Sequence, residues 1–157
     1  MDRQRELSDI GLLAMTPFII CFMGVWVSPW VIPGSLAFDF REFSILYGAI
    51  AASFFAGANA IAIIAKGPAS GETILPGLVA VAVALVAAMP VGALFIALPN
   101  IARFLLVIGV LIYLLLRDLR AVAGGLFPTW YGDLRTRLTF WACISLAMVM
   151  ARLLLRI

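Results

Sequence analysis

Long uncharged runs separated by short polar segments dominate the chain. The first, Ile10–Trp30, contains no charged residue. It is long enough to cross a bilayer, because a helix rises about 1.5 Å per residue and about 20 residues span the hydrocarbon core. Pro17 falls in the first half of this run and predicts a kink. The second run, Phe43–Ala65, lies between Glu42 and Lys66. We therefore expect transmembrane helices over residues 10–30 and 43–65.

A third uncharged run covers residues 73–102, which is too long for one helix and too short for two. In a first interpretation, one helix covers residues 74–97, the Leu-Pro-Asn sequence at 98–100 forms a turn, and the next helix covers residues 101–116. Arg103 then lies near the start of that helix, from which its long side chain can reach the lipid headgroups.

A second interpretation places the turn at the Met-Pro-Val-Gly sequence of residues 89–92 and begins the next helix at Ala93. Arg103 would then lie in the middle of the membrane, where an unpaired charge is costly and marks a functional site. We favour the first interpretation because it places Arg103 at an interface, although it leaves Pro90 inside a helix.

The longest polar connection, Arg117–Arg137, precedes a last apolar run that predicts a helix over residues 138–155. Trp and Tyr favour membrane interfaces, and Arg can bind lipid phosphates. Asp118 is interpreted as a member of an interfacial ion pair with Arg117 and Arg120 rather than as a proton relay. The candidate interfacial or lipid anchors are Arg103, Trp130, Tyr131, Arg135 and Arg137.

Small residues recur every four positions along the second predicted helix. One series contains Ser44, Gly48, Ala52, Ala56 and Ala60, and another contains Ala49, Ser53 and Gly57. A spacing of four places each series along one helix face, where a neighbouring backbone can approach closely. We expect this helix to be central in the bundle, and we favour packing within the chain over a dimer interface. The candidate packing residues are Gly48, Ala52, Ala56 and Gly57.

The composition indicates that lipid surrounds the chain. Hydrophobic residues make up 65% of the 157 residues and charged residues 12%, whereas soluble domains contain about 45–50% and about 25%. So few charges cannot cover a surface in water. The predicted fold is an all-α, polytopic membrane helical bundle of five transmembrane helices, formed by a single domain of residues 1–157.

The distribution of Lys and Arg predicts the topology, because cytoplasmic loops are enriched in both. Seven lie on the side of the N-terminus, namely Arg3, Arg5, Lys66, Arg117, Arg120, Arg135 and Arg137; four lie on the other side, namely Arg41, Arg103, Arg152 and Arg156. The N-terminus is therefore predicted to be cytoplasmic and the C-terminus periplasmic. The first residues mix both charge signs, which favours a retained helix in a bacterial inner membrane over a signal or transit peptide.

Several kinds of chemistry are not expected. The chain contains no His, which excludes His-ligated metals or haem and every His-dependent acid–base scheme. Cys21 and Cys143 lie in apolar runs and are interpreted as buried small side chains. No carboxylate falls inside a predicted span. We therefore expect no catalytic residue, no metal and no cofactor, and the absence of a clustered basic face argues against nucleic-acid binding.

Asn59 is the strongly polar uncharged side chain deep in the second predicted helix. An amide in lipid needs a partner, so Asn59 is expected to face the bundle. We favour a hydrogen bond between helices over a ligand pocket. Asn59 and Ser53 are the candidate polar contacts within the membrane.

Two stretches resemble the transmembrane protein 69 family, also known as domain of unknown function 3429. They are Tyr47–Gly57 and Leu126–Thr139, and the Pro-x-Trp-Tyr-x-x-Leu-Arg-x-x-Leu-Thr sequence in the second is the more specific. The resemblance implies a short five-helix protein of an inner membrane and a break at Leu98-Pro99. Relatives usually carry a His-Trp pair where this chain has Asn59 and Ala60, so an amide replaces that His here. The resemblance implies no activity.

Three functions compete. The expected one is a structural, accessory or assembly subunit of a larger respiratory or photosynthetic membrane complex, with the lipid bilayer and other membrane subunits as partners. The alternative is a small transporter or channel, which would need to form a homo-oligomer and to hold a polar cavity around Asn59. An enzyme is least expected, because the acid–base residues are missing.

Overall fold

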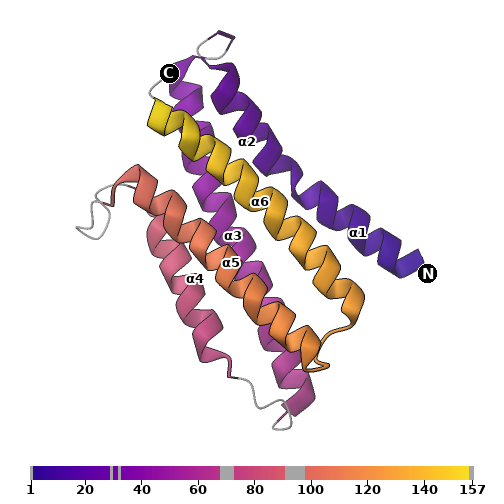
Figure 1. Ribbon diagram of the computed structural model, residues 1–157. Coiled ribbons are helices and arrows are strands. Elements are labelled where there is room, and N and C mark those ends of the chain that lie inside the picture. Colours follow the sequence, from indigo (N-terminus) through magenta and orange to yellow (C-terminus); the bar gives the residue numbers. More distant parts are fainter. Residues whose placement is uncertain (1, 29, 32, 68–72, 91–97, 156–157) are drawn as a thin grey trace.

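The chain folds into a bundle of helices that lie side by side (Figure 1). The computed structural model describes residues 2–28, 30–31, 33–67, 73–90 and 98–155, and within these ranges there is no strand. The all-α membrane bundle predicted from the sequence is therefore confirmed. The helices are α1 (Asp2–Ala14), α2 (Thr16–Val27), α3 (Gly34–Lys66), α4 (Leu75–Ala88), α5 (Asn100–Ala123) and α6 (Thr129–Leu155).

The first two helices follow one another with a one-residue interruption at Met15, close to Pro17. Helix α1 ends at Ala14 and α2 begins at Thr16, with Pro17 in its first turn. Because Pro lacks a backbone N–H, the helical hydrogen bonding is interrupted there. The indole nitrogen of Trp26 donates to the carbonyl of Met148 at 3.0 Å, which ties α2 to α6.

Three helical stretches are long and apolar enough to cross a membrane, namely Ser8–Val27, Gly34–Lys66 and Thr129–Leu155. Helix α3 begins well before the expected residue 43, because Pro33 precedes its first turn. Its 33 residues measure about 50 Å, which exceeds a hydrocarbon core of about 30 Å. Helix α6 begins at Thr129 instead of residue 138. The count of five spans stays a prediction.

Pro90 and Pro99 of the third uncharged run each lie next to a helix end. Helix α4 ends at Ala88 instead of residue 97, and Met89 has an extended backbone, as expected for the residue that precedes a proline. Helix α5 begins after Pro99, as the first interpretation requires. It continues to Ala123, seven residues beyond the expected end at Leu116. Residues 91–97 lie outside the described part of the chain.

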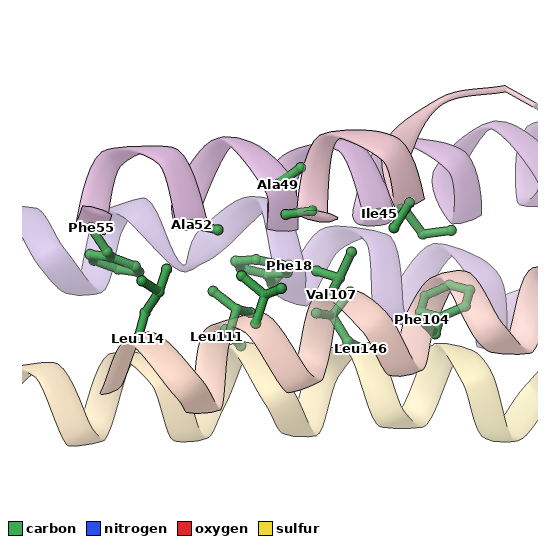
Figure 2. Close-up of a cluster of buried hydrophobic side chains, with 14 of the residues drawn as sticks. Phe18, Ile45, Ala49, Ala52, Phe55, Phe104, Val107, Leu111, Leu114 and Leu146 are labelled. Carbon is green, nitrogen blue, oxygen red and sulfur yellow. The ribbon is translucent and has the colours of Figure 1, made fainter. Parts of the chain in front are cut away.

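Helix α3 is central, as the small residues predict, because it contacts α2, α4, α5 and α6. Its apolar side chains face those of α5 (Figure 2). A Cβ atom at Gly48 would lie 2.6 Å from Cγ1 of Val107, so this glycine lets the two helices approach closely. Ala52 is fully buried. A Cβ at Gly57 would meet no atom within 4 Å, so Gly57 makes no such approach.

Large apolar side chains cover the outside of the bundle. Leu13 and Phe54 are each 72% exposed, and Ile61 is 70% exposed. A water-soluble protein rarely leaves a continuous apolar surface of this kind uncovered, whereas a surface in contact with lipid requires it. Several polar side chains are instead buried, among them Asn59, Arg103 and Asp118.

Candidate functional site

Four buried polar side chains from three helices form one network inside the bundle. The Asn59 amide nitrogen on α3 donates to Oδ1 of Asp118 on α5 at 2.9 Å. On α6, Nε of Arg135 donates to Oδ2 of the same carboxylate at 2.6 Å, and Nη1 donates to the Thr139 hydroxyl at 2.9 Å. Asp118 and Arg135 are each 1% exposed. We call these four residues the Asp118 network.

Asp118 belongs to the buried face of α5. The residues Val107, Leu111, Leu114, Asp118 and Ala121 are all buried, and they recur at spacings of three and four, which place them on one face of a helix. The expected pairing of Asp118 with Arg117 and Arg120 is wrong. Neighbours in sequence point in different directions on a helix, and Asp118 pairs with Arg135 on the next helix.

The Arg135 guanidinium lies between the Asp118 carboxylate and an aromatic ring. Its guanidinium carbon lies 3.2 Å from the ring centroid of Phe55 on α3, which adds a cation–π contact to the ion pair. Its Nη2 atom is buried and has no hydrogen-bond partner among the described residues. Arg135 was expected to reach lipid phosphates. It does not, because its side chain points into the bundle and its charge is neutralised there.

The network holds three helices at fixed positions. Removing one partner of a buried ion pair leaves an uncompensated charge in a medium of low dielectric, which costs about 3–5 kcal/mol. Asp118 therefore fixes α5 to α6 through Arg135 and to α3 through Asn59. The sequence-based prediction that Asn59 faces the bundle and bonds another helix is confirmed.

A second buried arginine lies in the first turn of α5. Arg103 is 1% exposed, and its Nη2 lies 2.8 Å from Oε2 of Glu42 on α3. Its Nε and Nη2 also donate to the carbonyls of Ala87 and Ala88, at 2.8 and 3.4 Å. Those carbonyls belong to the last turn of α4, where no backbone partner is left. The expectation that Arg103 reaches the headgroups is therefore wrong, because the end of α4 holds it.

Cations satisfy the C-terminal carbonyls of other helices in the same way. Nη2 of Arg152 donates to the carbonyl of Ser28, the residue that ends α2, at 2.6 Å. Nζ of Lys66 donates to the carbonyl of Gly124, which ends α5, at 3.4 Å. A cation at a helix C-terminus also favours the helix dipole. The ends of α2 and α4 and the α5–α6 pair are thus each bonded by a buried arginine, and the end of α5 is bonded by the exposed Lys66.

The remaining candidate anchors lie nearer the surface. Trp130 and Tyr131 are half-buried, and the Tyr131 ring stacks on Phe127 with centroids 4.4 Å apart. Arg137 is exposed, so it is free to meet lipid. The Ser53 hydroxyl donates to the Ala49 carbonyl of its own helix at 2.9 Å and does not join the Asp118 network.

A crevice of about 200 Å³ between α3 and α4 reaches the Asp118 network from outside. Ser53, Asn59 and Arg117 supply its polar lining, and small or aliphatic side chains supply the rest. Asn59 separates this crevice from Asp118, since its amide bonds the carboxylate. Arg103 does not line the crevice and lies towards the opposite end of α5.

The network contains a carboxylate, a guanidinium, an amide and a hydroxyl, a set that suits charge pairing and hydrogen bonding. Within the described ranges, no three His, Cys, Asp or Glu side chains lie together as metal ligands. The sequence analysis did not predict that Asp118 is buried, nor that Arg135 bonds Asp118 and Thr139. The signal that could have found them is their register, because Arg135, Leu138, Ala142 and Val149 continue one buried face of α6.

Almost the whole chain matches one protein family. A family model described as "Protein of unknown function (DUF3429)" matches residues 4–151. This family agrees with the resemblance seen in residues 47–57 and 126–139. No curated protein and no solved structure matches the chain.

We predict that Arg103→Leu destabilises the bundle by about 3 kcal/mol, because it leaves two α4 carbonyls and Glu42 without their buried partner. Arg120→Leu is the matched control, since Arg120 is an exposed arginine of the same helix. Unfolding in mixed detergent micelles, followed by circular dichroism, measures both. Equal effects of the two substitutions would show that Arg103 does not hold the end of α4.

Proposed function

We propose that this chain, which belongs to the DUF3429 family of proteins of unknown function, is a structural, accessory or assembly subunit of a larger respiratory or photosynthetic membrane complex. One observation carries the proposal. The buried charged side chains Arg103, Asp118, Arg135 and Arg152 all bond partners inside the bundle, and half-buried Glu42 is the partner of Arg103. Charges used in this way stabilise the fold, and an intramembrane site for catalysis or transport needs groups that can reach a ligand.

The outer surface supports the same proposal. Apolar side chains on α3 and α4 are exposed, among them Phe54, Ile61 and Leu78, and they offer neighbouring membrane helices a surface for van der Waals packing. The chain contains no His, which fits the proposal that it has no enzymatic activity of its own.

Transport by a homo-oligomer is the second candidate. The crevice beside Asn59 favours it, because Ser53, Asn59 and Arg117 give that crevice a polar lining. The bundle is thin, so further copies of the chain would have to complete a path for a solute.

We further propose that the chain lies in a bacterial inner membrane with its N-terminus in the cytoplasm. The end of the bundle that holds Lys66, Arg120 and Arg137 carries exposed cations, and such an end faces the cytoplasm.

Cysteine labelling in intact cells tests this orientation. Asp133→Cys, at the start of α6, is expected to resist a membrane-impermeant maleimide, whereas Ser35→Cys, at the start of α3, is expected to react; both positions are exposed. The unaltered chain is the control for Cys21 and Cys143. The opposite labelling pattern would reverse the proposed topology.

Purification of the tagged chain from its native membrane in a gentle detergent tests the proposed function. We expect other membrane proteins to co-purify in fixed stoichiometry, identified by mass spectrometry, and to remain bound at high salt, because apolar packing is not screened by ions. A homo-oligomer with no other protein would contradict the accessory role and would favour transport.

A further inference from the structure

A long apolar groove lies on the outside of the bundle between α4 and α5, which are neighbours in Figure 1. Its volume is about 530 Å³. Leu75, Val79 and Val83 form one wall, and Leu105, Gly109 and Tyr113 form the other. A Cβ at Gly109 would meet no atom within 4 Å, so the groove exists partly because this residue has no side chain.

The length of the groove matches one leaflet of a bilayer. Leu75 and Val83 are eight residues apart on α4, which corresponds to about 12 Å. Half of the hydrocarbon core is about 15 Å thick. A partner helix that crosses the membrane would need a surface of about 30 Å, so the groove is too short for one and suits a single lipid chain.

The guanidinium of Arg117 lies beside the start of α4, between the Leu75 end of the groove and the α3–α4 crevice that Arg117 also lines. Arg117 follows Tyr113 by one helical turn, and its Nη2 donates to the carbonyl of Thr73, just before Leu75. A Cβ at Gly77 would lie 2.5 Å from Nη1 of Arg117, which places the guanidinium beside the first turn of α4. Arginine has five N–H donors, and the Thr73 carbonyl occupies one of them. Exposed Arg120 adds a second cation at this end.

We propose that this groove binds an anionic phospholipid of the adjoining leaflet, with one acyl chain between α4 and α5 and the phosphate at Arg117. The apolar walls match the chain, and the cations match the charge of the headgroup. The binding site is independent of the proposed function, since a lipid can occupy it whether the chain works as a subunit or as a transporter.

Native mass spectrometry of the full chain in mild detergent tests the site, with phosphatidylglycerol and phosphatidylcholine as probes. We expect the chain to retain phosphatidylglycerol about fivefold more strongly, the difference expected for one Arg near an anionic headgroup. Arg117→Gln should abolish this preference and Arg117→Lys should keep it. Gly109→Leu should lower the retention of both lipids, because it fills the groove.

Gly34→Leu is the matched control, since Gly34 is also a helical glycine whose Cβ position is open, and it lines neither this groove nor the α3–α4 crevice. It should leave lipid retention unchanged. Equal retention of the two lipids by the unaltered chain, or equal losses from the two leucine variants, would overturn the proposal. Conversion of a dimer into a monomer by Gly109→Leu would overturn it too, because a second copy would then occupy the groove.

Discussion

Every charged or polar group inside this bundle has to find its partner in the protein, because the hydrocarbon of a bilayer offers no water. This constraint explains the positions of the buried arginines. Arg135 neutralises Asp118 between α5 and α6, Arg103 bonds Glu42 and the end of α4, and Arg152 bonds the end of α2. Apolar packing is not directional. The hydrogen bonds and ion pairs of these arginines need particular partners, so they determine which helix ends lie together.

The two ion pairs lie towards opposite ends of α5 and act on different neighbours. Near its start, Arg103 joins α5 to α3 and α4; near its end, Asp118 joins it to α3 and α6. Between them, Gly48 allows α3 to approach Val107 closely. Polar contacts therefore join α5 to its neighbours at both of its ends, and close apolar packing joins it to α3 between them.

The fold class could be predicted from the sequence because uncharged runs and proline positions report directly on helices in lipid. The end of α5 and the start of α6 could not, since both helices continue through charged residues that a length rule takes as boundaries. Arg117 and Asp118 marked a loop in the sequence, yet the buried register of Val107, Leu111 and Leu114 extends to Asp118. The partner of Asp118 lies 17 residues away, and only the packing of α5 against α6 brings Arg135 to it. Asn59 was predictable because an amide in lipid has few alternatives.

A double-mutant cycle between Asp118 and Arg135 tests the central claim most directly. The free energy of unfolding in mixed micelles is measured for the unaltered chain, Asp118→Leu, Arg135→Leu and the combined variant. We predict a loss of about 3–5 kcal/mol for each single variant. The combined variant should lose much less than the sum, because neither charge is then left buried alone. Additive losses would contradict the account, since they would mean that the two side chains stabilise the bundle independently of each other.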